Sequence, residues 1–246
     1  MAIETTQIHQ LANGQTVEIT RRDGRGHQYI VDGVEKPMPS VTGMLGHVES
    51  GLFGVGQGWA TKQIRLANGD LDAPKRVGDK AVADGNDIHN AIEAYIKTGT
   101  VDEENLGFIS WLNTVGQDHD PYWVAAETFL YHPRMAYGGT LDAISNRFQE
   151  SILWDWKTKD PVSYNKYGGS LKDHAQVASY ADALNAMGSE FQGIQHAKIA
   201  YIMRDGSGTD VIDVDLEVGR KLFTLSRDLY LTTALYKDMT KPGTHE

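Results

Sequence analysis

The spacing of apolar residues changes near residue 120, and this change limits the folds open to the chain. In the first half the spacing is mainly helical, in Ser40–Leu45, Gly58–Ala67, Val77–Lys97 and Leu106–Val115, after two short strands, Thr16–Arg22 and His27–Val31. The second half begins with three alternating segments typical of strands, Trp123–Tyr131, Thr140–Phe148 and Ile152–Lys157. A helix, two strands and a final helix follow: Leu171–Met187, His196–Met203, Val211–Asp215 and Val218–Lys237.

This order of elements predicts an α/β fold in which helices flank a central sheet. We find no internal repeat, low-complexity tract or long linker in the sequence. The sequence therefore predicts one domain over residues 1–246, with a mainly helical N-terminal part (1–120) and an α/β core (121–246).

Composition excludes several kinds of site. The chain has 246 residues, no cysteine and a formal net charge of −10. Without cysteine there is no disulfide, thiolate zinc site or iron–sulfur cluster. The first ten residues lack a secretory signal and no apolar run reaches membrane-spanning length, so we expect a cytoplasmic protein without a membrane partner. An acidic chain needs its positive charge concentrated locally if it binds nucleic acid.

The segment from Gly138 to Lys159 carries the main chemical indication. Polar residues separate its two strands, which predicts a hairpin centred near Phe148 and Gln149. Such a hairpin places Asp142 roughly opposite Asp155, with Cβ atoms about 4.5–5.5 Å apart. Lys157 shares a face with Asp155, because residues two apart on a strand point the same way.

Two adjacent carboxylates repel each other unless a cation lies between them. Aspartate oxygens suit Mg²⁺ or Mn²⁺, and such an ion would activate a water and neutralise charge developing on phosphorus. A lysine on the same face could stabilise the transition state. The alternative is a surface hairpin with an ordinary salt bridge, since an Asp-x-Lys sequence is common.

Four short motifs in this chain occur together in one known family. They are Gly85-x-x-x-His89-x-x-x-Glu93, Gly139-x-x-Asp142, Asp155-x-Lys157-Thr158 and Gln176-x-x-x-Tyr180. In their order and their predicted elements they resemble the RecB-like exonuclease branch of the PD-(D/E)XK nuclease superfamily. Pro39-Ser-Val-Thr42 is similar to the N-terminal segment of the mitochondrial genome maintenance exonuclease and related phage exonucleases. Leu141 stands where the superfamily motif has proline, as is usual in this branch.

The resemblance implies a restriction-endonuclease-like core, a mixed sheet flanked by helices, and a metal centre. His89, Asp142, Asp155 and the backbone carbonyl of Trp156 would hold Mg²⁺ or Mn²⁺, and an imidazole ligand favours Mn²⁺. Glu127 would support this ion or a second one. In the alternative interpretation, His89 pairs with Glu93 one helical turn away and Glu127 is a solvated strand residue.

The resemblance also implies roles around the metal centre. Gln176 and Tyr180 would act beside the catalytic Lys157, although Tyr180 also fits the apolar face of its helix. Ser40 and Thr42 could bind a phosphate or simply cap a helix. The lysines at the basic edge after the third strand of the core, Lys159, Lys166 and Lys172, lie where a DNA strand could pass, or are ordinary solvated surface.

The function implied by the resemblance is a metal-dependent DNA exonuclease of phage or bacterial DNA recombination, repair or processing. Its substrate would be single- or double-stranded DNA, with a recombination or single-strand-binding protein as partner. Two alternatives stay open on the same fold: a nucleic-acid-binding or assembly protein without cleavage, and a site-specific endonuclease. The chain has no P-loop motif for a motor of its own.

Overall fold

Within the residues that the structure describes, five strands form the central sheet, in the order in which they follow one another along the chain. They are β5 (Tyr122–His132), β6 (Tyr137–Arg147), β7 (Glu150–Lys159), β8 (His196–Met203) and β9 (Thr209–Asp213). Among these described strands β7 and β8 run parallel and the other neighbours antiparallel, so the sheet is mixed. The computed structural model describes residues 3–24, 26–52, 54, 56–116, 122–147 and 150–239. The prediction of an α/β fold with a mixed central sheet is confirmed.

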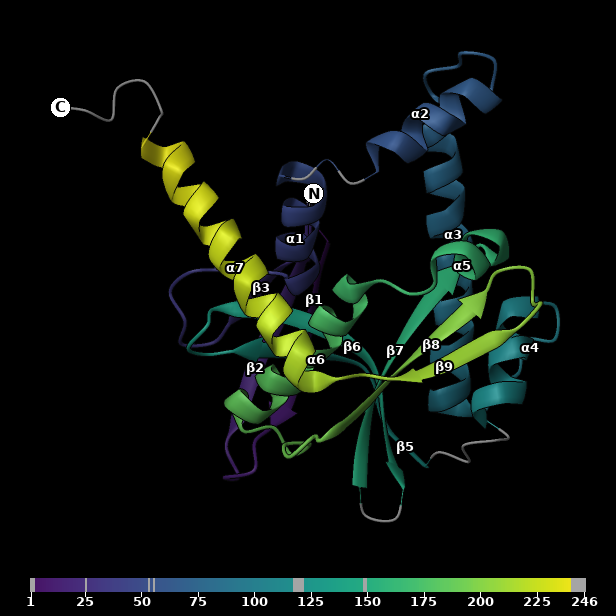
Figure 1. The fold of residues 1–246 in the computed structure, drawn as a ribbon. Helices are drawn as coiled ribbons and strands as arrows, with labels where there is room; N and C mark the ends of the chain where they lie inside the picture. The colour runs from purple at the N-terminus through teal and green to yellow at the C-terminus, as the bar shows by residue number, and fades with distance from the viewer. Residues whose placement is uncertain are drawn as a thin grey trace.

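Helices cover both faces of this sheet (Figure 1). The alternating residues of β7 decide which face each side chain enters. Trp154 and Trp156 pack into an aromatic core with α3 (Ala73–Thr98) and α4 (Leu106–Trp111). Leu153 points the other way, into a larger core with α6 (Leu171–Met187) and α7 (Leu216–Met239). Asp155 follows Leu153 by two residues and is therefore carried on the side of α6.

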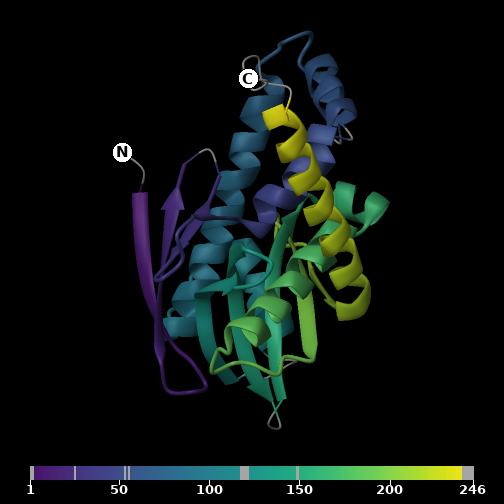
Figure 2. The ribbon, with the colours of Figure 1, turned by 90° about the vertical axis from the view of Figure 1, so that its left-hand side faces the viewer.

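The N-terminal part contains a second sheet beside its helices, and two of its described strands, β1 and β4, were not predicted. The four strands are β1 (Ile3–Gln10), β2 (Thr16–Asp23), β3 (Gln28–Val31) and β4 (Met38–Pro39). The two predicted strands correspond to β2 and β3. Both faces of β1 are largely exposed, so its sequence lacks the alternation that reveals a strand. Figure 2 shows this sheet standing beside the core.

Most of the remaining helices lie in the chain between the two sheets, and one follows β7. Helix α1 (Val41–Gly46) begins after the predicted cap Ser40 and continues as a π-helical segment, His47–Leu52. Helix α2 (Gln57–Leu66) and the first turns of α3 project from the body as one lobe (Figures 1 and 2). Another π-helical segment, Leu112–Gly116, extends α4. Helix α5 (Pro161–Tyr167) was not predicted, because it is short and has no buried residue.

Candidate metal centre

The candidate site lies where β6 and β7 separate. The two strands pair from Arg147–Glu150 to Ala143–Trp154, and beyond this point β6 stays with β5 and β7 with β8. The predicted hairpin register is confirmed, although Phe148 and Gln149 lie outside the described residues. At the fork, Asp142 Oδ2 accepts a hydrogen bond of 2.5 Å from the backbone N–H of Trp156. The Asp142 carboxylate thus accepts from a backbone N–H of β7 that no longer pairs with the backbone of β6.

Two helices bring further side chains to this fork, and glycines allow their close approach. A Cβ at Gly85 would lie 2.9 Å from Thr158 Oγ1, so α3 rests directly on β7. His89 follows Gly85 by one helical turn and faces the fork. A Cβ at Gly139 would lie 2.4 Å from a ring carbon of Tyr180, so α6 rests on β6 in the same way. The glycines of both motifs are positions of contact between elements.

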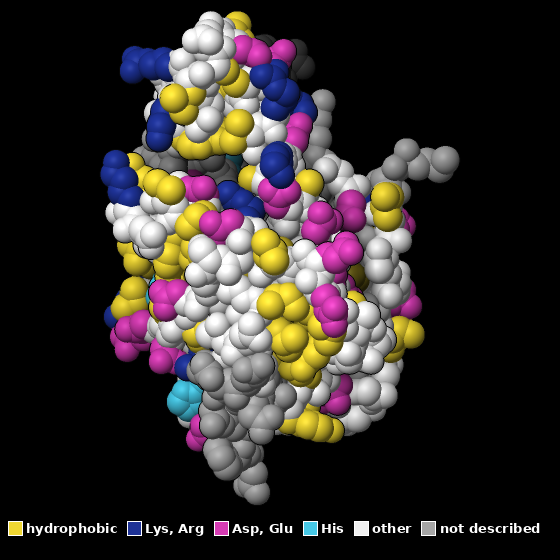
Figure 3. Space-filling model, turned by 90° about the vertical axis from the view of Figure 1, so that its right-hand side faces the viewer, with side chains coloured by type: hydrophobic (Ala, Val, Ile, Leu, Met, Phe, Trp, Pro, Cys, Tyr) yellow, Lys and Arg dark blue, Asp and Glu magenta, His cyan; other side chains and the backbone are white. Residues whose placement is uncertain are grey.

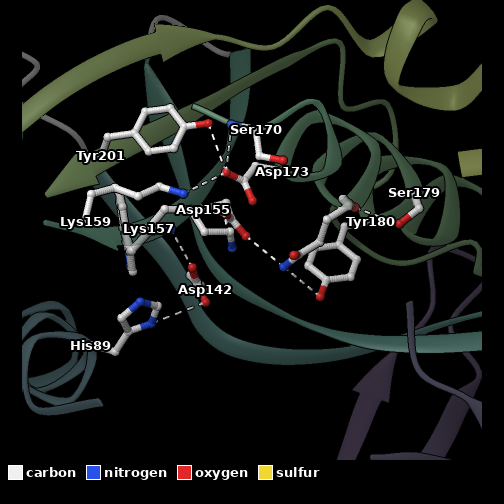
Figure 4. Close-up of polar contacts among 12 residues, drawn as sticks. His89, Asp142, Asp155, Lys157, Lys159, Ser170, Asp173, Ser179, Tyr180 and Tyr201 are labelled. Carbon is white, nitrogen blue, oxygen red and sulfur yellow. Dashed lines mark hydrogen bonds and ion pairs between the residues drawn. The ribbon is translucent and has the colours of Figure 1, made fainter. Parts of the chain in front are cut away.

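Three side chains from three elements form a group that could hold a metal ion. His89 of α3, Glu127 of β5 and Asp142 of β6 each offer a ligand atom, and these atoms lie within 4.8 Å of one another. His89 Nδ1 is 3.8 Å from Asp142 Oδ1 (Figure 4). The alternative partner of His89, Glu93, instead forms an ion pair with Lys97. Imidazole with two carboxylates suits a divalent transition ion such as Mn²⁺.

The backbone at Glu127 is strained. Its φ is 49°, in the left-handed region that a glutamate rarely adopts. This conformation costs roughly 1–2 kcal/mol for an L-residue. Strain of this kind persists only where surrounding contacts hold it, and it gathers at functional sites. The solvated-strand interpretation of Glu127 does not explain it, because the residue is half-buried and faces the other two ligands.

Asp155 is held differently from Asp142. Its Oδ1 accepts a hydrogen bond of 3.1 Å from Gln176 Nε2, and its Oδ2 lies 2.6 Å from Lys157 Nζ. Gln176 also donates to the hydroxyl of Tyr180, at 3.1 Å. The structure therefore brings together all five residues expected to be catalytic, and Tyr180 both packs in the core and bonds to Gln176. In this arrangement Lys157 and Gln176 engage the Asp155 carboxylate.

Burial shapes the ionisation of these groups. It raises the pKa of Asp155 to about 7 and of Glu127 to about 8, and it raises that of Asp142. Burial lowers the pKa of His89 to about 4, so the imidazole is neutral and ready to act as a ligand. Burial alone would lower the pKa of Lys157, but Asp155 and the neighbouring acids raise it. A hydrogen bond between the His89 imidazole and the backbone of Trp156 acts in the opposite direction and raises the pKa of His89. The Trp156 carbonyl therefore lies beside His89 at the candidate metal centre.

These acids fit a cation, and the fit predicts a pH dependence. Carboxyl groups with a raised pKa bind protons more tightly in the folded chain than in the unfolded chain. The stability that these carboxyl groups contribute to the metal-free protein therefore falls as the pH rises from the ordinary carboxyl pKa near 4 towards 8, whereas the lowered pKa of His89 acts in the opposite direction up to its usual value of 6.5. A cation competes with those protons, so its affinity rises over the upper part of this range. We expect Mn²⁺ to raise the thermal unfolding midpoint more at about pH 8.5 than at about pH 6. Equal shifts would contradict the site.

The expected substrate-binding residues lie outside this cluster. Ser40 is buried and its hydroxyl accepts from Gly43 N, so it caps α1, and Thr42 Oγ1 lies 3.3 Å from it. Lys159 Nζ is 3.4 Å from Asp173, and Lys172 Nζ is 2.9 Å from Glu49. The third lysine of the basic edge, Lys166, stands over the ring of Tyr167.

One residue near the site was missed from sequence. Asp173 is buried, and its Oδ2 accepts from Lys159, from the Tyr201 hydroxyl at 3.1 Å and from Ser170 N (Figure 4). It links the start of α6, the helix that carries Gln176, to β7 and β8. The capping pattern Ser170-x-x-Asp173 could have revealed it.

Comparisons with known proteins give no family for this chain. No protein-family model matches it, and no curated protein is similar to it in sequence. Among solved structures, one described as SSO0001 is 15% identical, with 69% of this chain and 71% of that chain covered and a TM-score of 0.35. An alkaline exonuclease from Laribacter hongkongensis is 11% identical, with 63% and 84% covered and a TM-score of 0.32. At such low TM-scores, the fold assignment rests on the strand topology and the candidate site on its own geometry.

Proposed function

We propose that this protein is a divalent-metal-dependent nuclease that hydrolyses phosphodiester bonds of DNA from an end, in phage or bacterial recombination, repair or processing. The observation that carries the proposal is the fork between β6 and β7. There His89, Glu127 and Asp142 converge beside the linked side chains of Asp155, Lys157 and Gln176. An acid cluster that can hold a divalent ion, next to a half-buried lysine, is suited to phosphoryl chemistry.

Each group has a distinct part in this proposal. His89, Glu127 and Asp142 would hold Mg²⁺ or Mn²⁺, with Asp155 and the Trp156 carbonyl as further candidates at the same fork. When bound, such an ion supplies an activated water and neutralises charge on the phosphate. Lys157 donates to the oxygens on which negative charge develops. Gln176 orients Asp155 through their hydrogen bond, and Tyr180 supports Gln176 from below.

End-labelled DNA tests the proposal directly. Single- and double-stranded oligonucleotides are incubated with Mg²⁺, with Mn²⁺ or with EDTA, and the products are separated on a denaturing gel. We expect a ladder that grows from one end, only in the presence of a divalent ion. Discrete internal bands would replace the exonuclease with a site-specific endonuclease. Binding without any cleavage would leave a nucleic-acid-binding protein on the same fold.

Positive charge for the DNA gathers on the projecting lobe. Figure 3 shows lysine and arginine side chains over α2 and the start of α3, at the top of the molecule. Three of these cations are paired with acids, Lys75 with Asp79, Arg76 with Asp70 and Lys80 with Asp84. No ion pair within the described part of the chain includes Lys62 or Arg65 of α2. Their charges are therefore available to phosphates.

A salt series separates this lobe from the basic edge after β7. Each phosphate contact with a single strand contributes about −0.7 to the slope of log K against log[salt]. In an Asp155→Asn background, Lys62→Gln with Arg65→Gln should flatten the slope by about 1.4. Changing Lys159, Lys166 and Lys172 to glutamine should flatten it by only about 0.7, because two of the three already have acidic partners. Fluorescence anisotropy measures both slopes, and the reverse order would place the strand along the basic edge.

A further inference from the structure

The side chain of Gln7 spans from the N-terminal sheet to the strand that carries Glu127. Its Nε2 donates to the backbone carbonyl of Glu127 at 2.7 Å, and its Oε1 accepts from the backbone N–H of Phe129 at 2.8 Å. Both bonds join residues about 120 positions apart in the sequence. The Gln7 amide thus forms hydrogen bonds with the backbone of β5 on both sides of Thr128.

These two backbone groups are those with which a further strand would pair. β5 is an outer strand of the central sheet, with β6 on one side. On its other side, the carbonyl of one residue and the N–H of the second residue after it point the same way. The amide of Gln7 offers one donor and one acceptor, and so satisfies both groups as a neighbouring strand would.

One of these two hydrogen bonds is made to the strained residue, Glu127. Glu127 is in the left-handed conformation, and its carbonyl is the group to which Gln7 donates. Within the same residue, the carboxylate lies within 4.8 Å of the ligand atoms of His89 and Asp142. The direction of the side chain depends on the backbone conformation, so whatever fixes the carbonyl also aims the carboxylate.

We propose that Gln7 is a positioning residue for the metal centre: it holds Glu127 in its left-handed conformation and thereby aims the Glu127 carboxylate at His89 and Asp142. This gives the N-terminal sheet a role in the chemistry of the core. The Gln7 amide bonds to the backbone of Glu127 and Phe129, so its role would be indirect and not that of a ligand. The inference rests on the proposed metal centre and predicts that metal affinity depends on a side chain outside it.

The test measures Mn²⁺ affinity by calorimetric titration in the absence of DNA. Gln7→Met keeps the length of the side chain and removes both hydrogen bonds. We expect it to weaken Mn²⁺ binding by about 10-fold or more, the usual effect of losing a partner that orients a ligand. Gln7→Glu retains the acceptor for Phe129 but lacks the donor for Glu127, and should also weaken binding. Gln10→Met, an identical change at an exposed position of β1, should leave it unchanged.

A double-mutant cycle distinguishes positioning from general destabilisation. In a Glu127→Gln background the Gln7→Met change should have little further effect on Mn²⁺ affinity, because its route to the ion is already lost. An equal loss in both backgrounds, or unchanged affinity of both Gln7 variants, would overturn the inference. Wild-type protein that binds Mn²⁺ but cleaves no DNA would sink the proposed function alone, since this titration needs no cleavage.

Discussion

Asp155→Asn is expected to abolish DNA cleavage while the protein stays folded. Asp155 is buried at the fork between β6 and β7, beside Asp142 and in an ion pair with Lys157. Asparagine has nearly the same shape but supplies no charge to hold a cation or to anchor Lys157. Loss of the repulsion from Asp142 partly offsets loss of the ion pair, so we expect the metal-free thermal midpoint to change little. Calorimetric titration should show much weaker Mn²⁺ binding than in the wild type.

The chain offers a matched control for this change. Asp213 of β9 also forms an ion pair with a lysine, 2.6 Å from Lys198, but its side chain is 85% exposed. Asp213→Asn removes a charge and an ion pair from the same sheet without touching the fork, and should leave cleavage and Mn²⁺ binding unchanged. If Asp155→Asn cleaves DNA and binds Mn²⁺ as well as this control does, Asp155 has no part in the site.

Much of this arrangement could be predicted from local sequence. The alternation of Leu153, Trp154, Asp155 and Trp156 fixes which side chain of β7 enters which face, because neighbours on a strand point to opposite sides. The polar residues between the two strands, from Asn146 to Ser151, predict where the hairpin turns and therefore its register. This register places Asp142 near Trp156. Such features depend on residues close together in the chain, where periodicity is a strong guide.

What could not be predicted depends on contacts between distant segments. β1 is a strand because it pairs with β2, and its own exposed residues carry no periodic pattern. The left-handed backbone of Glu127 and its hydrogen bond with Gln7 depend on the contact between the two sheets, which are far apart in sequence. Whether the lysines of the basic edge are free to bind phosphate depends on which acids lie beside them. The acids that pair with two of them, Asp173 and Glu49, come from other elements. Sequence reveals the charge of a lysine but not its partner.

Lys157→Ala is expected to slow cleavage by about 10²–10³ while DNA affinity stays close to that of the wild type. The Lys157 ammonium group lies 2.6 Å from Asp155, and the side chain is 21% exposed, so it is not sealed off from the solvent. A group that acts on developing charge stabilises the transition state more than bound DNA, and its loss lowers the rate of the chemical step. Single-turnover cleavage measures this rate, and fluorescence anisotropy with EDTA measures affinity.

Lys198→Ala is the control that makes this result specific. Lys198 matches Lys157 closely, with its Nζ 2.6 Å from an aspartate and its side chain 20% exposed, yet its partner Asp213 lies on β9. General loss of a paired lysine from the sheet would affect both variants alike. We expect only Lys157→Ala to lose activity, because only Lys157 adjoins the carboxylates that would hold the ion. Lys157→Ala cleaving within a few-fold of Lys198→Ala would reduce the Asp155–Lys157 pair to an ordinary salt bridge. Lys157 would then have no part in the hydrolytic chemistry, and the role of Asp155 would rest on the Asp155→Asn result.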